Sequence, residues 1–248
     1  MDVVKSKEQN KCMPVFAKPA NVETGPTKWE DVWDHIWQTG ASGCFISAGR
    51  EAYNVLLRKL LMRHLSLKSR LLELGCGTST LTLSLAPHIK ELVGLDISAK
   101  GLDIARQNQE KWKISNATFV KADCRNVPFV GEFDVVWSAG LIEHFFDEDI
   151  NIVREHLKAL KPGGVALMSV PYAYSLHSLH YLLTRPAVTR RFWPWSQERY
   201  FQRFYSHRDL HVLGKCLGSL FKVYLLPPAP LGLLLGIIIL EVQPTDRS

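Results

Sequence analysis

Two glycines one residue apart follow a short apolar run in the segment Leu71-Leu-Glu-Leu-Gly-Cys-Gly-Thr-Ser79. The pattern predicts a strand that turns sharply into a helix, because glycine permits a tight turn and lets a ligand lie against the backbone. Dinucleotide-binding loops are related, but they carry a third glycine, which is absent here. Glu73 also stands just before the turn. A carboxylate there would repel a pyrophosphate, and it suits a ligand that carries an ammonium and a sulfonium group.

Two further acidic residues follow at positions where a ligand could be bound. Asp96 ends the run Leu92-Val-Gly-Leu-Asp96. It stands about twenty residues beyond the glycine turn, where a doubly wound fold places an acid against ribose hydroxyls. The alternative is that Asp96 caps the next helix together with Ser98.

The third acidic position lies in Phe119-Val-Lys-Ala-Asp-Cys124. An acid at the end of a third strand can accept a hydrogen bond from the exocyclic amine of adenine, and the next backbone N–H can donate to the ring. The alternative is that Asp123 is an ordinary surface-loop acid.

The elements that would position these residues alternate along the chain between short apolar runs and amphipathic segments of helical length. Such alternation predicts an α/β fold with a doubly wound, mostly parallel sheet. Two closing apolar runs predict an antiparallel hairpin at its end. The expected strands are 70–74, 91–96, 117–121, 133–138, 165–170, 221–226 and 233–242, and the expected helices are 50–64, 79–88, 98–112, 148–160 and 206–218.

We expect a single domain over residues 1–248, divided into four parts. Residues 1–64 form an N-terminal helical cap, in which Trp29, Trp33 and Trp37 share one helix face. Residues 65–171 form the ligand-binding core, and 206–248 form a final helix and hairpin. Residues 172–205 form an insertion that leaves the fifth strand at the edge where such sheets bind ligands. We expect it to cover the site; the alternative is a packing excursion without ligand contact.

The charge balance is basic and uneven. The net charge is +6, and basic residues outnumber acidic ones strongly between Tyr172 and Lys222. Such a field can attract an anionic substrate, a nucleic acid or an acidic membrane surface. The alternative is a solvated basic face without a ligand.

The cysteine pattern and the apolar segments indicate where in the cell the protein is expected. The five cysteines are widely spaced without a C-x-x-C pair, which argues against a disulfide framework or a metal site and fits a reducing compartment. The first residues show no apolar signal segment. The run Val223–Leu240 is about as long as a membrane span, but Pro227, Pro228 and Pro230 interrupt it and favour a buried hairpin. We therefore expect a cytoplasmic protein with at most peripheral membrane contact.

Taken together, the motifs resemble those of the class I (Rossmann-like) S-adenosylmethionine (SAM)-dependent methyltransferases. The resemblance covers about Leu65 to Val170 and the terminal hairpin. It implies SAM as the cofactor and a seven-stranded sheet whose last strand is antiparallel. The matching motifs are Glu73-x-Gly75-x-Gly77, Asp96, Ala122-Asp123, Phe133-Asp-Val-Val-Trp-Ser138 with Glu143-His144, and Leu160-Lys-Pro-Gly-Gly164.

The resemblance also implies roles for individual residues in cofactor binding. The glycine turn, with Cys76 between its glycines, would pass under the methionine part of SAM, and Glu73 would orient the amino group. The residues that would hold the ribose, contact the adenine and wall the pocket are Asp96 with Ile97, Asp123 with Cys124, and Ser138 with Ala139. Ser79 departs from the family pattern, because a third glycine often stands there.

The methyl acceptor is less well defined, because these motifs are nearly silent about it. His144 is the candidate general base, with Glu143 beside it; the alternative is a structural histidine. An aromatic-rich pocket suits a small, flat or lipid-like acceptor, and we expect no nucleic-acid partner. The alternatives are an RNA or protein methyltransferase that uses the basic insertion, and a SAM-binding protein without catalysis. The candidate wall residues are Trp29, Trp33, Trp37, Phe45, Tyr172 and the cluster 192–204.

Overall fold

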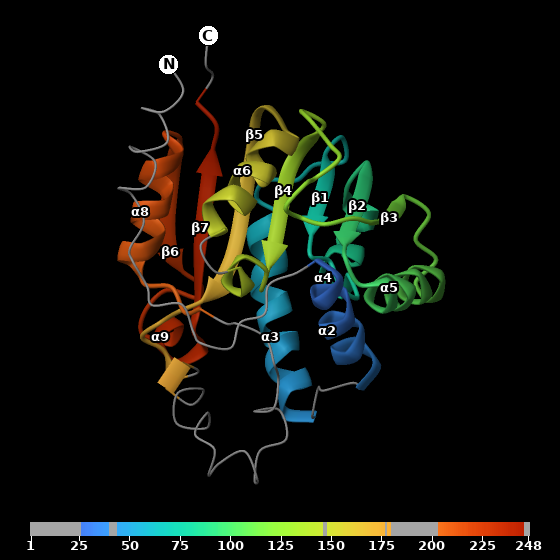
Figure 1. Cartoon of the computed structure of the whole chain (residues 1–248), viewed down its shortest axis with the longest axis horizontal. Helices are drawn as coiled ribbons and strands as arrows, with labels where there is room; N and C mark the ends of the chain where they lie inside the picture. The colour runs from blue at the N-terminus through green and yellow to red at the C-terminus, as the bar shows by residue number, and fades with distance from the viewer. Residues whose placement is uncertain (1–25, 40–43, 146–147, 177, 180–202, 246–248) are drawn as a thin grey trace.

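A seven-stranded sheet forms the centre of the computed structural model, which describes residues 26–39, 44–145, 148–176, 178–179 and 203–245 (Figure 1). The strand order is β3-β2-β1-β4-β5-β7-β6, and only β7 runs antiparallel to both of its neighbours. This confirms the predicted fold. The strands are β1 (Arg70–Leu74), β2 (Glu91–Asp96), β3 (Ala117–Lys121), β4 (Phe133–Ala139), β5 (Leu160–Pro171), β6 (Leu220–Leu225) and β7 (Ile237–Gln243).

The order of the parallel strands reverses at β1, which pairs with β2 on one side and with β4 on the other. From β1 the chain passes outward to β2 and β3, and it then returns to β4 and β5 on the opposite side. The connections leave β1 and β4 in opposite directions at this point, so a crevice opens at their carboxyl ends. Open α/β sheets bind ligands at such a position.

Helices cover both faces of the sheet (Figure 1). One buried cluster includes Leu72, Val136 and Ile152, and the other includes Leu61, Leu71 and Trp137. Consecutive residues of β1 thus contribute to opposite clusters, as the alternation of side chains along a strand requires. The helices are α2 (Pro26–Thr39), α3 (Cys44–Leu61), α4 (Thr80–Leu83), α5 (Ala99–Lys111), α6 (Asp149–Ala159), α8 (His207–Leu217) and α9 (Leu231–Leu235), with 3-10 turns η1 (Ala86–His88) and η2 (Ile142–His144).

Four elements differ in length from the prediction. The helix expected over 50–64 is α3, which begins at Cys44 and ends at Leu61, and the last strand begins at Ile237 rather than at 233 because α9 occupies 231–235. The helix expected over 79–88 is only the single turn α4, followed by η1. Pro87 supplies no backbone N–H, which prevents a continuous α-helix there. The fifth strand begins at Leu160 rather than at 165. Its pairing with β4 continues to Leu160 because the register of the ladder shifts between Phe133 and Val135, and this shift accommodates the turn at Gly163.

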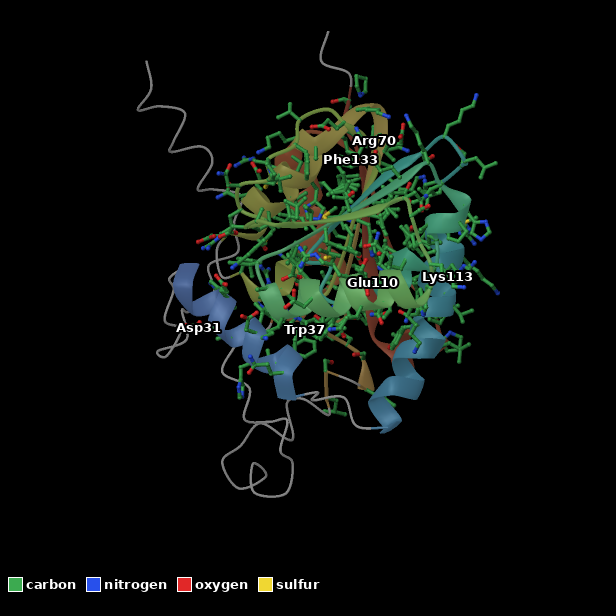
Figure 2. All side chains as sticks on the ribbon, turned by 90° about the vertical axis from the view of Figure 1, so that its right-hand side faces the viewer. Asp31, Trp37, Arg70, Glu110, Lys113 and Phe133 are labelled. Atoms are coloured by element: carbon green, nitrogen blue, oxygen red, sulfur yellow. The ribbon has the colours of Figure 1, made fainter. Side chains whose placement is uncertain are left out.

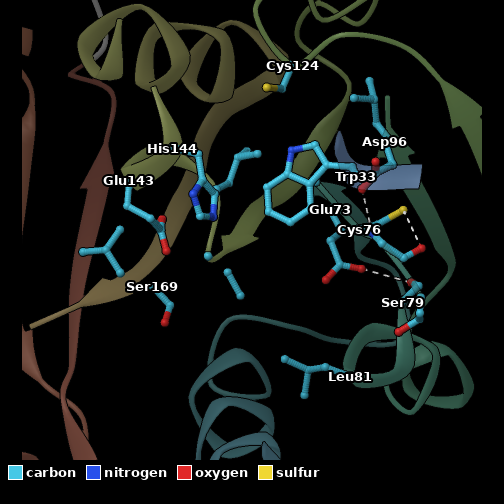
Figure 3. A pocket seen from close by; sticks show the side chains of 18 of the residues that line it. Trp33, Glu73, Cys76, Ser79, Leu81, Asp96, Cys124, Glu143, His144 and Ser169 are labelled. Atoms are coloured by element: carbon cyan, nitrogen blue, oxygen red, sulfur yellow. Dashed lines mark hydrogen bonds between the residues drawn. The ribbon is translucent and has the colours of Figure 1, made fainter. Parts of the chain in front are cut away.

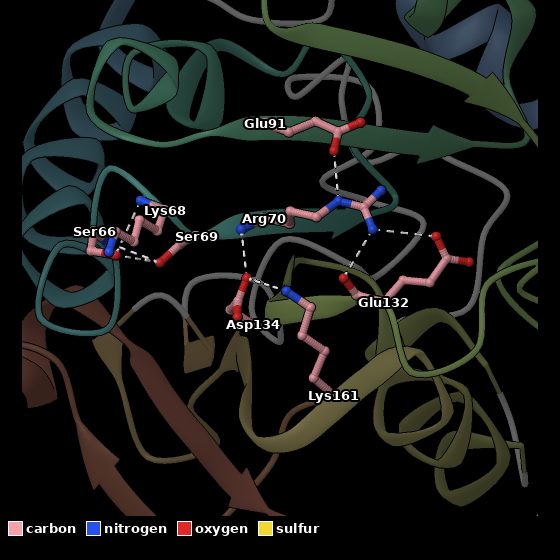
Figure 4. A network of polar contacts seen from close by, with 8 residues as sticks. All are labelled: Ser66, Lys68, Ser69, Arg70, Glu91, Glu132, Asp134 and Lys161. Carbon is pink, nitrogen blue, oxygen red and sulfur yellow. Dashed lines mark hydrogen bonds and ion pairs between the residues drawn. The ribbon is translucent and has the colours of Figure 1, made fainter.

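A polar network holds the amino ends of the central strands together, at the opposite end of the sheet from the crevice (Figure 4). The Arg70 guanidinium donates to Glu91 Oε2 at 2.6 Å and to the Glu132 carbonyl at 3.1 Å. The Arg70 backbone N–H donates to Asp134 Oδ2, which also accepts from Lys161 Nζ. The network links β1, β2, β4 and β5 and fixes their register.

The apolar run Val223–Leu240 forms part of β6, the short helix α9 and part of β7, with the three prolines in the connection. The two strands pair antiparallel, from Leu220 opposite Gln243 to Leu225 opposite Ile238. Within the described ranges, no helix combines the length and the apolar character needed to cross a membrane.

Candidate active site

A cavity of about 570 Å³ opens at the carboxyl ends of β1, β2, β4 and β5 (Figure 3). Its lining combines the glycine turn after β1 with the ends of the other three strands. Helices α2 and α3 complete the wall with Trp29, Trp33, Trp37, Tyr53, Asn54 and Leu57. No motif in the sequence marks Tyr53, Asn54 or Leu57.

The glycines of the turn are required by the backbone and by their neighbours. Gly75 has φ +67° and Gly77 has φ +47°, a region that residues with a Cβ rarely adopt. A Cβ on Gly75 would lie 2.7 Å from Leu141 Cδ1, and a Cβ on Gly77 would lie 2.4 Å from the ring of Trp37. Both glycines line the cavity, so a ligand can approach the main chain closely there.

Asp96 lies at the floor of this part of the cavity, between the glycine turn and the start of α5. Its Oδ2 accepts from the Gly77 N–H at 2.7 Å, and its Oδ1 accepts from the Ser98 N–H at 2.8 Å. Burial raises the pKa of this carboxyl, although these backbone donors oppose the shift. The Ile97 N–H also contributes a hydrogen bond, so three backbone donors orient the carboxylate, and it can still accept from a ligand hydroxyl in the cavity that it lines.

Glu73 has one carboxyl oxygen occupied by protein donors. Ser79 Oγ donates to Oε2 at 3.0 Å, and Thr82 Oγ1 donates to the same oxygen. Burial raises the pKa of Glu73 to about 7. A ligand ammonium group beside this carboxylate would stabilise its ionised form. The serine that replaces the third glycine therefore orients Glu73, even though Ser79 takes a left-handed φ of 51°.

Asp123 and Cys124 lie at the far end of the same region. Burial favours a higher pKa for Asp123, but the hydrogen bonds and charge of Arg125 outweigh it and lower the pKa. Arg125 Nε lies 3.0 Å from both Asp123 oxygens, so this carboxylate is already engaged. A ligand amine would share Asp123 with the guanidinium group. Cys124 is buried, and burial raises the pKa of its thiol well above the usual value.

Ser138 points away from the cavity. Its Oγ donates to His156 Nε2 at 2.9 Å, and His156 Nδ1 donates to the Ile152 carbonyl at 2.8 Å. Burial lowers the pKa of His156 to about 4, so this imidazole is neutral. The other predicted cofactor-site residues line the cavity, namely Glu73, Gly75, Cys76, Gly77, Asp96, Ile97, Asp123, Cys124 and Ala139. Ser138 instead ties β4 to α6.

The turn η2 places the two candidate catalytic residues on the opposite wall (Figure 3). Glu143 is 2% exposed and His144 is 6% exposed, and both line the cavity with Ser169 of β5. Burial raises the pKa of Glu143 to about 8. The His144 imidazole packs edge-on against Trp33, with ring centroids 4.9 Å apart.

Residues 203–205 hold the turn η2 in place. The Arg203 N–H donates to the Glu143 carbonyl at 2.9 Å, and Arg203 Nη1 forms an ion pair with Asp149 Oδ2 at 2.7 Å. The buried Tyr205 hydroxyl donates to the same carboxylate at 3.2 Å. These contacts were not predicted, because no sequence motif marks a pairing across more than fifty positions. The available signal was Tyr205 directly before the capping-box pair Ser206 and Asp209.

Helix α2 lies across the cofactor side of the cavity. Asp34 Oδ1 accepts from Ser98 Oγ and from the Lys100 N–H at the start of α5, and Glu30 pairs with Lys121. The tryptophans therefore face inward, with Trp37 against Gly77, while the exposed Asp31 occupies another face of the helix (Figure 2). The sequence pattern predicted the tryptophan face but not the acidic contacts.

Three further predictions concern the acceptor side. Trp29, Trp33 and Trp37 line the cavity. Tyr172 is outside the lining; it is buried against Tyr174 and His207, with ring centroids 5.7 and 5.6 Å apart. The Phe45 side chain, and residues 180–202 with most of the aromatic cluster and the basic insertion, lie outside the described part of the chain.

Comparison with known proteins extends these observations. Residues 71–164 match the family model described as a methyltransferase domain. The chain is 30% identical over 131 residues to the malonyl-[acyl-carrier protein] O-methyltransferase of Enterobacter lignolyticus, an overlap of 52% of this chain and 49% of that protein. It is 24% identical over 140 residues to the ubiquinone biosynthesis O-methyltransferase of Coxiella burnetii, covering 52% and 58%. The chain thus spans about half the length of these relatives.

A solved structure described as the DhpI–SAH complex has the same fold. It aligns with 90% of this chain and 98% of its own, with a TM-score of 0.66 and 18% identity. The domain match and the sheet topology together define the class of protein. Residues 71–164 match a methyltransferase domain within a Rossmann-like fold, which confirms the resemblance seen in the motifs.

Proposed function

We propose that this protein binds SAM and transfers its methyl group to a small acceptor with an apolar or aromatic body. One observation carries the proposal. A single cavity brings together the glycine turn, Asp96 and Glu73 on one side and the wall of Glu143, His144 and the α2 tryptophans on the other. A donor and an acceptor can therefore meet within it.

The residues on the cofactor side suit the chemistry of SAM. The glycine turn lines the cavity with main chain, and the Asp96 carboxylate beside it is placed to accept from a ribose hydroxyl. Glu73 supplies a carboxylate for an amino group, and no pyrophosphate-binding third glycine is present. The solved complexes of DhpI with SAH and of the N-methyltransferase NodS from Bradyrhizobium japonicum with S-adenosyl-L-homocysteine share this fold.

The protein's own contribution is to position the acceptor and exclude water. SAM supplies an activated methyl group when bound. Holding two reactants in line contributes on the order of 7–11 kcal/mol at best. Helix α2 closes the cofactor side through Trp37, and Trp33 fixes the His144 ring at the acceptor side. His144 and Glu143 are the groups placed to receive a proton from an acceptor that must lose one.

The acceptor side supports a small molecule. Its lining includes the apolar side chains of Leu57, Leu81, Val170 and Ile237 together with Tyr53. Of the two relatives, one is named as a malonyl-[acyl-carrier protein] O-methyltransferase and the other as an O-methyltransferase of ubiquinone biosynthesis. We therefore place the acceptor's apolar body between α3 and the ends of β5 and β7.

Titration calorimetry and a labelling experiment test the proposal. We expect SAM and S-adenosylhomocysteine (SAH) to bind the full chain with one site, and NAD not to compete. Incubation with methyl-labelled SAM and a cell extract should place the label in the small-molecule fraction. Label confined to RNA or protein would contradict the acceptor class, and SAM-competitive binding of NAD would contradict the cofactor.

A further inference from the structure

One oxygen of a buried carboxyl group that lines the acceptor side of the cavity lacks a hydrogen-bond partner among the described residues. Glu143 Oε2 has no hydrogen-bond partner within the described part of the chain, although the residue is only 2% exposed. The carboxyl points toward the open space beside Ser169 (Figure 3). Buried polar groups are almost always paired. An unpaired buried oxygen on a residue that lines a cavity points to a ligand as its partner.

The charges around the cavity define what that partner can be. The carboxyl groups of Glu73, Asp96, Asp123 and Glu143 all line it. Arg125 is the only lysine or arginine among its described lining residues, and its guanidinium group bonds to Asp123. An anionic acceptor would thus meet Glu143 without a neutralising cation. A cationic acceptor would supply the missing charge and the missing hydrogen bond together.

Aromatic rings line the same space. Trp33, Tyr53 and Phe145 contribute to the wall with His144. The faces of such rings attract a cation, most strongly where water is excluded. Carboxylate and aromatic groups together are a suitable environment for an ammonium group attached to an apolar body.

We propose that Glu143 binds the nucleophilic nitrogen of the acceptor, and that the acceptor is an amine with an apolar or aromatic body. This rests on the proposed methyl transfer and specifies its acceptor. An ammonium group donates to the Glu143 carboxylate; transfer of one proton breaks an N–H bond, forms an O–H bond and frees the nitrogen lone pair. Overall, the ammonium form of the amine and SAM give the N-methylammonium product, SAH and one proton, which leaves by way of Glu143.

Binding of an amine should release a proton. Burial raises the pKa of Glu143 to about 8, so its carboxyl is mostly protonated at neutral pH, and pairing with an ammonium group ionises it. The other titratable groups at this turn are His144 beside it, and Arg203 and Tyr205. Arg203 forms ion pairs with Asp149 and Asp209.

The test uses calorimetry on the full chain saturated with SAH. The probes are 2-phenylethylamine and its neutral and anionic counterparts, 2-phenylethanol and 3-phenylpropanoate. Buffers with different ionisation enthalpies measure the protons released. Glu143→Gln removes the proposed contact. Glu241→Gln is the matched control, because Glu241 is also buried but bonds to Lys222 and Tyr224 away from the cavity.

We expect the wild-type protein to bind the amine at least tenfold more tightly than the other two probes at pH 7, with release of most of one proton. Glu143→Gln should lose both the preference and the proton release while it binds SAH as before, and Glu241→Gln should retain both. No binding of the amine, equal binding of all three probes, or a preference that survives in Glu143→Gln would overturn the assignment. Absence of SAH binding would instead contradict the proposed cofactor function.

Discussion

Asp96 connects two backbone donors to the space where a ribose would lie. Its oxygens accept from the N–H groups of Gly77 and Ser98, so the carboxylate is oriented before any ligand arrives. We expect Asp96→Ala to weaken SAM binding by about 1.5–3 kcal/mol, which is typical for hydrogen bonds to a charged group. Calorimetry measures the loss. Asp103→Ala on the exposed side of α5 is the control, and equal affinities in all three proteins would remove Asp96 from the binding site.

The raised pKa of Glu143 affects stability as well as binding. Its carboxyl titrates at about 8 in the folded chain against an ordinary value of 4.5. Between these values the folded state holds a proton that the unfolded chain releases. The contribution of Glu143 to the free energy of unfolding is therefore complete below about pH 4.5, and it is lost as the pH rises through about 8.

We therefore expect the free energy of unfolding of the ligand-free protein to decrease from pH 5 to pH 8. One such group contributes at most about 1.4 kcal/mol per pH unit. Glu143→Gln should show a shallower decrease in urea denaturation. Part of the slope should remain, because burial also raises the pKa of Glu73 to about 7. Parallel curves for the two proteins would contradict the buried, protonated state of Glu143.

At the scale of elements, α2 is held over the cavity by its acidic residues as well as by its tryptophans. Glu30 pairs with Lys121, and Asp34 accepts from Ser98 and from the Lys100 N–H. Exposed pairs of this kind contribute about 0.2–1 kcal/mol each, and buried hydrogen bonds contribute somewhat more. Removing both acids should loosen the helix by about 1–2 kcal/mol.

Amide hydrogen exchange measures this loosening. We expect residues 26–39 to exchange roughly tenfold faster in the Glu30→Ala, Asp34→Ala double variant, as about 1.4 kcal/mol implies. Asp31→Ala on the exposed face of α2 should exchange like the wild type. An unchanged rate in the double variant would show that the tryptophan contacts alone retain α2.

The sequence predicted the features that short-range patterns along the chain determine. Alternating apolar runs predicted all seven strands, and the glycine turn and Asp96 were recognisable because their spacing along the chain is short. Contacts between distant segments carry no such signal. Arg203 reaches Asp149 across fifty-four positions. The inward or outward direction of Ser138 depended on His156, a partner that no strand pattern reveals.

At the scale of the whole molecule, β7 lies inside the sheet rather than at its edge. It pairs with β5 and β6, and Ile238, Ile239 and Leu240 are fully buried. We expect Ile239→Ala to lower the free energy of unfolding by about 2–5 kcal/mol, the usual loss for such a truncation in a core. Chemical denaturation measures it. Leu231→Ala, at a side chain that is 56% exposed, should change stability by less than about 0.5 kcal/mol.

The position of β7 also sets the order in which the sheet can be completed during synthesis. Both of its neighbours, β5 and β6, precede it in the chain, and they do not pair with each other. A nascent chain that has not yet reached Ile237 therefore presents an unpaired edge on β5 and leaves β6 without a partner. Such edges template pairing with other chains. Ribosome pausing before this strand would expose the growing protein to aggregation, and chaperone contact is most useful in that interval.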